Sequence, residues 1–285
     1  MQFGIQQFCL REATKNKEGA LSALDEIKRF GFSGIELNAF MLGKLSFGVR
    51  MLCKMAGMPV GSGNIDWKEE VKKRGLSVIS LHKDLNGILN EPAKTADEAK
   101  ALGAKYVVVT GMQFLDYSKP ENVKKLCEDL NKAGKLLKTG GVELLYHNHN
   151  VEFMYIGDVS EYKTPYEAIT KLTDPEYVNF EVDTYWLSEC GKDAKKLLET
   201  LGGRVKLIHI CDRGIRATKK TGSIKKSSCT ELGTGNIDIE GILDVAEKIG
   251  VEYAVLEQTS DFIDKDNMKS VKISAEYLKK YFAKN

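Results

Sequence analysis

The segment VELLYHNHNVEF (residues 142–153) decides how the rest of the sequence is interpreted, because an apolar run leads there directly into polar residues. Its first part, VELLYHN (142–148), contains the apolar pair Leu144-Leu145 and is followed at once by a second histidine, so that His147 and His149 are half of the four histidines in the chain. A nearly continuous apolar run indicates a strand that is covered on both faces, as in a parallel sheet. We therefore predict a buried parallel strand with polar side chains at its carboxyl end.

The same pattern recurs along the chain, and it alternates with longer helical patterns. The eight predicted strands are QFGIQQF (2–8), SGIELN (33–38), LSVISLH (76–82), KYVVVTG (105–111), VELLYHN (142–148), YVNFEVD (177–183), RVKLIHI (204–210) and EYAVLEQ (252–258). The helical patterns include GALSALDEIKRFG (19–31), PENVKKLCEDLNKAGKLLKTGG (120–141), IEGILDVAEKIG (239–250) and MKSVKISAEYLKKYF (268–282). The first three end in glycine, the usual residue just after a helix.

Eight strands that alternate with helices over 285 residues predict an α/β protein with a (β/α)8 (TIM) barrel fold, a single domain over residues 1–285. The alternative is a doubly wound open sheet, which usually carries a glycine-rich phosphate turn after its first strand. Here that turn reads QQFCLREATKNKEG (6–19) and has no GxGxxG pattern. We favour the barrel, in which functional groups lie at the C-terminal ends of the strands.

The composition excludes several classes of function. Lys and Arg number 42 against 40 Asp and Glu, a balance that argues against nucleic acid or an anionic membrane as a partner. No apolar run approaches the ~20 residues needed to cross a bilayer. The N-terminal MQFGIQQF lacks the pattern of a secretory signal, so we expect a cytoplasmic protein. The six cysteines show no CxxC spacing, so we expect them to be reduced.

Ionisable residues close three successive strands, the sixth, seventh and eighth. These are Asp183, His209 and Glu257. Burial of several ionisable groups at one barrel mouth is costly unless they pair or share a cation. A mixed oxygen and nitrogen site of this kind suits Mn²⁺, Mg²⁺ or Co²⁺, with Zn²⁺ as an alternative. We therefore predict a divalent metal site at this end of the barrel.

The fifth strand is the natural source of a fourth ligand. On an extended strand His147 and His149 point to one side and Asn148 to the other. Glu152 follows the strand and can reach back over the barrel mouth. One of these groups would bind the metal and another would contact the substrate.

Several segments together resemble the sugar phosphate isomerase/epimerase group of the xylose-isomerase-like barrels. They are GIQQFCLRE, GFSGIEL, YHNHNVEF, FEVDTYWLSECGKD, LIHICDR, ELGTGNID and YAVLEQ, which extend from about Phe3 to Glu257. The resemblance implies a divalent metal held by Glu, Asp, His and Glu from the last four strands. The last three ligands fall on Asp183, His209 and Glu257. The fifth strand departs from the pattern because it ends in Tyr-His-Asn-His; Glu152 is our preferred ligand, with His147 or His149 as the alternative.

The resemblance also implies an enzyme that isomerises or epimerises a sugar, keto-sugar or sugar phosphate by moving the proton next to a carbonyl through an enediolate. Glu152 and Glu257 are the expected bases, with His149 or His147 in that role if Glu152 is structural. Expected contacts to the small-molecule carbohydrate are Gln7, His82, Trp186 and Arg213. Trp186 would be an aromatic floor for a sugar ring, although packing is an equal explanation.

Three other functions remain open. The same metal site could expel a hydroxyl next to the enediolate, which would make the protein a keto-sugar lyase or dehydratase. A phosphodiesterase of the abasic-site endonuclease type is disfavoured, because the chain has few histidines and is not strongly basic. A non-catalytic carbohydrate-binding barrel would need no metal ligands at its strand ends.

Three further segments have two interpretations each. The repeated GSGNID (61–66) and GTGNID (233–238) favour helix N-caps at Asp66 and Asp238 over a cradle for phosphate. The basic segment 213–228 is a solvated loop or a lid for an anionic ligand. The apolar, Met-rich segment 40–58 is core or an oligomer contact, so a homo-oligomer remains an open expectation.

Overall fold

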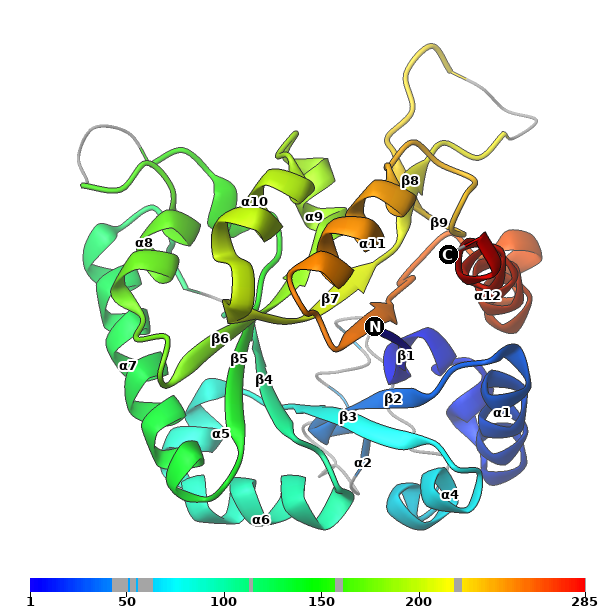
Figure 1. Cartoon of the computed structure of the whole chain (residues 1–285), viewed down its shortest axis with the longest axis horizontal. Coiled ribbons are helices and arrows are strands. Elements are labelled where there is room, and N and C mark those ends of the chain that lie inside the picture. The colour runs from blue at the N-terminus through cyan, green and yellow to red at the C-terminus, as the bar shows by residue number, and fades with distance from the viewer. Residues whose placement is uncertain are drawn as a thin grey trace.

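The computed structural model describes residues 1–42, 51, 55, 64–112, 115–156, 161–217 and 222–284. Eight parallel strands form a closed barrel in the order β1-β10-β7-β6-β5-β4-β3-β2, which confirms the predicted fold. They are β1 (Gln2–Gln6), β2 (Gly34–Asn38), β3 (Ser77–His82), β4 (Tyr106–Thr110), β5 (Glu143–His147), β6 (Val178–Asp183), β7 (Val205–Ile210) and β10 (Tyr253–Leu256). Figure 1 shows these strands as a central ring with helices around its outside.

The helices follow the strands in alternation, as the sequence patterns predict. They are α1 (Lys17–Phe30), α2 (Ala39–Leu42), α4 (Trp67–Lys73), α5 (Leu85–Asn90), α6 (Pro92–Leu102), α7 (Pro120–Thr139), α8 (Pro165–Leu172), α9 (Thr184–Glu189), α10 (Ala194–Leu201), α11 (Ile239–Lys248) and α12 (Asn267–Lys284). Helix α1 ends at Gly31, whose φ of 99° is left-handed and therefore favours glycine.

Alternation along each strand divides the apolar residues between two layers. On β5, Leu144 and Tyr146 belong to the large core between the barrel and its helices. Leu145, on the opposite face, belongs to a small separate cluster inside the barrel with Leu207 and Val255. The next residues on that inner face, such as His147, are polar and buried. The barrel therefore has an apolar floor and a polar mouth at the C-terminal ends of its strands.

The basic segment 213–228 begins and ends in a short antiparallel pair that the sequence did not predict. Strand β8 (Asp212–Gly214) pairs with β9 (Ser228–Thr230), and Figure 1 shows the described residues next to this pair, 215–217 and 222–227, extending away from the barrel. Residues 218–221 lie outside the described residues, so a lid remains a prediction. The segment 40–58 also lies mostly outside them, and its role in the core or in an oligomer remains a prediction as well.

The GTGNID segment folds around a carboxylate of the chain itself. Asp212 Oδ2 accepts the backbone N–H groups of Gly233 and Gly235 at 3.0 and 2.8 Å, and Asp212 Oδ1 accepts that of Ile237 at 3.1 Å. Asp238 caps α11 by accepting the N–H of Gly241. The cap interpretation is therefore confirmed for this copy, because its N–H groups already hold Asp212. Asp66 likewise caps α4, although residues 61–63 lie outside the described part.

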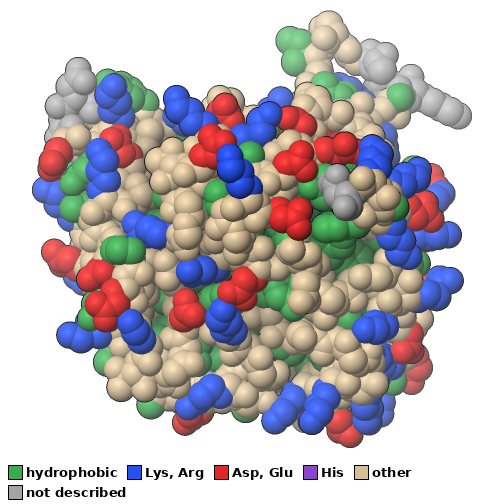
Figure 2. Space-filling model, viewed as in Figure 1, with side chains coloured by type: hydrophobic (Ala, Val, Ile, Leu, Met, Phe, Trp, Pro, Cys, Tyr) green, Lys and Arg blue, Asp and Glu red, His purple; other side chains and the backbone are tan. Residues whose placement is uncertain are grey.

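Charged side chains of both signs are interspersed over the face that Figure 2 shows, as the near-neutral composition leads one to expect. In the described part of the chain, no helix combines the length and the apolar character that crossing a membrane would require. The five cysteines in that part are free thiols, in agreement with the predicted reduced state.

Candidate metal centre at the barrel mouth

Four side chains at the C-terminal ends of neighbouring strands converge on one point. They are His147, Asp183, His209 and Glu257, and one potential ligand atom of each lies within 4.8 Å of the others. His209 Nδ1 lies 2.9 Å from Glu257 Oε2 and 4.0 Å from Asp183 Oδ2. His147 Nε2 lies 3.9 Å from Asp183 Oδ2. The three ligands predicted from the sixth to eighth strands are therefore together, and His147 is the fourth member.

Strand register explains why these residues meet. His209 is level with Asp183 on β6 and with Val255 on β10, and all three face the interior. Glu257 continues beyond β10, and its N–H still donates to the carbonyl of Ile210. Asp183 Oδ1 accepts the N–H of Trp186 at the start of α9, which leaves Oδ2 turned toward the histidines. Each carboxylate thus presents one oxygen to the common point.

Glu152, the preferred ligand from the sequence, lies outside this group of four. Its Oε1 accepts the hydroxyl of Tyr146 at 2.8 Å, and its Oε2 accepts the backbone N–H of His149 at 3.0 Å. The short 3-10 turn Val151–Phe153 directs the carboxylate behind His149, where it is fully buried. Glu152 therefore supports the loop that carries His149.

The two histidines of the fifth strand share a face, as the strand pattern predicts. The ring centroids of His147 and His149 are 5.3 Å apart. Asn148 points the other way: it accepts the backbone N–H of Asp183 at 3.1 Å and donates to its carbonyl at 3.3 Å. Asn148 thus fixes the end of β5 against the end of β6.

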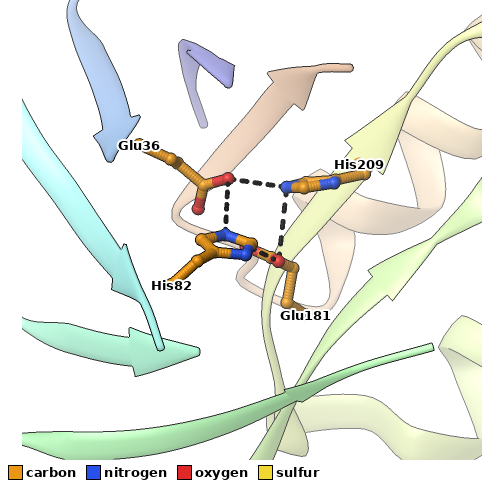
Figure 3. Close-up of side chains that lie close together, drawn as sticks. All are labelled: Glu36, His82, Glu181 and His209. Atoms are coloured by element: carbon orange, nitrogen blue, oxygen red, sulfur yellow. Dashed lines mark hydrogen bonds and ion pairs between the residues drawn. The ribbon is translucent and has the colours of Figure 1, made fainter. Parts of the chain in front are cut away.

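A second layer of polar groups lies deeper in the barrel. Figure 3 shows Glu36 (β2), His82 (β3), Glu181 (β6) and His209 (β7) pointing toward one another. His209 Nε2 lies 2.6 Å from Glu36 Oε2 and 3.3 Å from Glu181 Oε2. His82 Nε2 lies 3.3 and 3.4 Å from the same two oxygens.

Sequence reasoning gave these two glutamates no role. Neither Glu36 nor Glu181 was among the residues predicted for the site. The available signal was the two-residue period of a strand, which puts Glu181 on the same inward face as Asp183.

Burial keeps the two histidines of the fifth strand neutral. Burial first, and the neighbouring His209 second, lower the pKa of His147 to about 3. Burial and the neighbouring His147 lower the pKa of His149 to about 4. Both imidazoles therefore keep a lone pair at physiological pH, as a metal ligand or a proton acceptor requires.

The carboxylates and His209 influence one another strongly. Burial alone would raise the pKa of Glu257, but His209 outweighs it and lowers that pKa to about 2. Burial and the charge of Glu257 raise the pKa of Asp183 well above its usual value. Burial and the nearby Glu36 raise the pKa of Glu181 to about 7. Repulsion between buried carboxylates is relieved by a cation, so two carboxylates and two imidazoles fit a divalent metal.

A cavity of about 580 Å³ opens onto these groups. Its described lining includes Gln6, Asn38, Thr110, His82, His147, His149 and Glu257. Of the predicted substrate contacts, His82 lies in this lining and the other three do not belong to its described part.

The other three predicted contacts have partners elsewhere. The strand β1 ends at Gln6, so Gln7 is buried behind it and accepts the backbone N–H of Asn38. Trp186 packs edge-on against His149, with the ring centroids 5.7 Å apart. Arg213 donates to the carbonyl of Ser188 at 2.6 Å.

The family model described as xylose isomerase-like TIM barrel matches residues 24–281. The chain belongs to this family. The resemblance seen in the sequence is therefore confirmed.

Three known proteins that are similar to this chain carry different names. An inosose dehydratase of Mesomycoplasma hyopneumoniae (strain J) is 35% identical over 192 residues, which cover 61% of this chain and 58% of that protein. The match thus spans less than two thirds of that relative's length. A sugar phosphate isomerase/epimerase from Parabacteroides distasonis has a TM-score of 0.76 at 23% identity, over 97% of this chain and 92% of that one. A structure of the IOLI protein with a zinc atom has a TM-score of 0.69 at 15% identity, and the match covers 100% of this chain and 99% of that one. At these identities the two structures show the shared fold.

Proposed function

We propose that this protein is a divalent-metal-dependent dehydratase that removes water from a keto-sugar or a cyclic keto-polyol. The observation that carries the proposal is the convergence of His147, Asp183, His209 and Glu257 beside a polar cavity. The name inosose dehydratase on the relative from Mesomycoplasma hyopneumoniae supports elimination over the isomerisation that we first expected from the sequence. The zinc atom in the IOLI structure, which shares this fold, supports a bound metal ion.

The donor set narrows the choice of metal. Two imidazoles and two carboxylates suit Zn²⁺, Co²⁺ or Mn²⁺ better than Mg²⁺, which prefers oxygen ligands alone. A divalent ion held there would polarise the ketone of a bound substrate and so lower the cost of removing the proton on the neighbouring carbon.

His149 is the group best placed to take that proton. It lines the cavity, it is not one of the four converging residues, and burial keeps its ring neutral. Glu152 holds the backbone of His149 from behind, at 3.0 Å, and so fixes where the ring stands.

The leaving hydroxyl then needs a hydrogen-bond donor. His82 and Thr110 lie together in the cavity lining, with His82 Nδ1 3.2 Å from Thr110 Oγ1. In our proposal they hold this hydroxyl in place while His149 passes to it the proton taken from carbon, so that it departs as water and His149 returns to its neutral form.

The test is a panel of keto-sugars and keto-polyols, including an inosose, with the protein loaded in turn with Mn²⁺, Co²⁺ and Zn²⁺. Proton NMR and mass spectrometry should show an unsaturated product that is lighter by one water, and chelation of the metal should stop its formation. A product of unchanged mass would support the isomerase or epimerase interpretation instead. Sugar binding without turnover, unaffected by chelation, would indicate a non-catalytic binding barrel.

A further inference from the structure

We propose that Glu36 and Glu181 are positioning residues for the metal centre, because each holds the ring nitrogen of a ligand histidine that faces away from the metal. This inference rests on the proposed metal centre, since it assumes that His209 and His147 are ligands. It assigns a role to the two glutamates of the deeper layer, which supply no ligand in the proposed function.

Each of the two imidazoles lies between a carboxylate of the proposed metal centre on one side and a glutamate of the deeper layer on the other. His147 turns Nε2 toward Asp183, at 3.9 Å, and Nδ1 toward Glu181, at 2.9 Å. His209 turns Nδ1 toward Glu257, at 2.9 Å, and Nε2 toward Glu36, at 2.6 Å. The two rings thus use opposite nitrogens toward the metal centre, and a buried carboxylate stands behind each.

A bound metal ion would decide the tautomer of both rings. A neutral imidazole carries one N–H, and the nitrogen that binds a metal must keep its lone pair. With the metal among the four converging side chains, the N–H of His147 would lie on Nδ1 and that of His209 on Nε2, each donated to the glutamate behind the ring. The lone pairs would then remain on Nε2 of His147 and Nδ1 of His209, the two nitrogens that face the converging group. An acceptor behind a ligand histidine fixes its ring and makes the ligand nitrogen more basic.

Strand geometry places the two glutamates deeper in the barrel than the metal centre, behind the rings of His147 and His209. Glu181 is level with His147 across the β5–β6 pair and stands two residues before Asp183, on the same inward face. Glu36 reaches His209 across the barrel interior from β2. Both glutamates are fully buried, and Ser80 donates to the second oxygen of Glu36 at 2.8 Å. Burial of two carboxylates inside a barrel has a large desolvation cost. Apolar residues of similar size would fill the same space without that cost, so packing alone does not explain the two glutamates.

The same layer could be read as a second metal site formed by Glu36, His82, Glu181 and His209. The part that His209 plays in the proposed centre argues against it. The 2.6 Å between His209 Nε2 and Glu36 Oε2 is that of a short charge-assisted hydrogen bond, which needs an N–H on Nε2. His209 would also need both ring nitrogens for metals, which leaves no N–H for Glu36.

The experiment compares metal affinity in matched variants of the full chain. Isothermal titration with Co²⁺ is carried out on wild type, Glu36→Leu, Glu181→Leu and the Gln variants of both positions. The Leu side chains fill the space without an acceptor, whereas Gln restores an acceptor oxygen. Glu231→Gln is the control for loss of a buried carboxylate elsewhere, since Glu231 is equally buried but bonds to Ser270. Asp183→Asn tests the metal centre itself, and ¹⁵N NMR of the histidine rings reports their tautomers.

We expect each Leu variant to bind Co²⁺ about 10–100-fold more weakly at an unchanged stoichiometry of one. Each Gln variant should recover part of that loss, the control should match wild type, and the ring that lost its acceptor should change tautomer. If the Leu variants bind like wild type while Asp183→Asn loses the metal, the positioning role is wrong and the centre stands. If Asp183→Asn keeps the metal, the centre itself is wrong, and the proposed function with it. Two equivalents of Co²⁺ in wild type, of which the Leu variants lose one, would overturn the positioning role in favour of a second metal site.

Discussion

Replacement of Glu152 separates a support for His149 from a metal ligand. The side chain is fully buried, and its carboxylate accepts the hydroxyl of Tyr146 at 2.8 Å and the backbone N–H of His149 at 3.0 Å. Glu152→Leu removes this acceptor from the N–H of His149 and leaves the Tyr146 hydroxyl with the Tyr117 hydroxyl, 3.1 Å away, as its partner. At about 1–3 kcal/mol for an orphaned buried donor, the free energy of unfolding should fall by about 1–3 kcal/mol through the N–H of His149. Glu152→Gln keeps one acceptor oxygen and should lose less than half of that.

Metal content gives the sharper readout for the same residue. Because Glu152 lies outside the converging four, Glu152→Gln should bind Co²⁺ with nearly wild-type affinity, while kcat falls because His149 is less firmly held. His147→Ala is the matched comparison and should lose the metal. Denaturant unfolding and titration calorimetry measure the two effects separately. If Glu152→Gln folds normally but loses the metal, the carboxylate is a ligand, as we first predicted from the sequence.

Two further variants test the surroundings. In Gly111→Ala, the added Cβ would lie 2.3 Å from Glu152 Oε1 and 3.0 Å from His149 Nδ1 and would displace both side chains. We expect kcat to fall by about 10–100-fold while the metal content is unchanged. An unchanged kcat would show that His149 takes no part in the reaction. Burial alone would raise the pKa of Glu231, but hydrogen bonds led by that from Ser270 lower it to about 2, below its value in the unfolded chain. The ionised form therefore stabilises the fold above about pH 4.5, and this stabilisation is lost as the pH falls toward 2. The difference in unfolding free energy between wild type and Glu231→Gln, about 3 kcal/mol at most at neutral pH, should shrink over that range, and a constant difference would contradict the assignment.

The fold could be predicted from the sequence because its signals are local. Apolar runs of strand length and glycine stops such as Gly31 each depend on a few neighbouring residues, and their alternation permits few topologies. The predicted ends of the strands were less accurate than the strands themselves. β1 stops at Gln6 because that side chain accepts the N–H of Phe8 and starts a 3-10 turn. The strand therefore ends two residues before its predicted end, and Gln6, not Gln7, lies at the cavity.

The convergence of Asp183, His209 and Glu257 was also predictable, because parallel strands in a barrel end at the same face. The fifth-strand member was not. Whether Glu152 reaches the mouth depends on the turn after β5, and that turn directs the carboxylate to Tyr146. The pairing of Glu36 with His209 was beyond sequence reasoning too, since closure of the barrel brings together residues 173 positions apart.

The central claim is that one divalent ion binds among His147, Asp183, His209 and Glu257, and anomalous X-ray diffraction from crystals soaked in Co²⁺ tests it most directly. Our account predicts a single strong peak within about 2.0–2.4 Å of one donor atom from each of these four side chains. The peak should be absent from crystals of Asp183→Asn grown and soaked in the same way. A peak bounded by Glu36, His82 and Glu181 instead, or no peak at the barrel mouth, would contradict the claim.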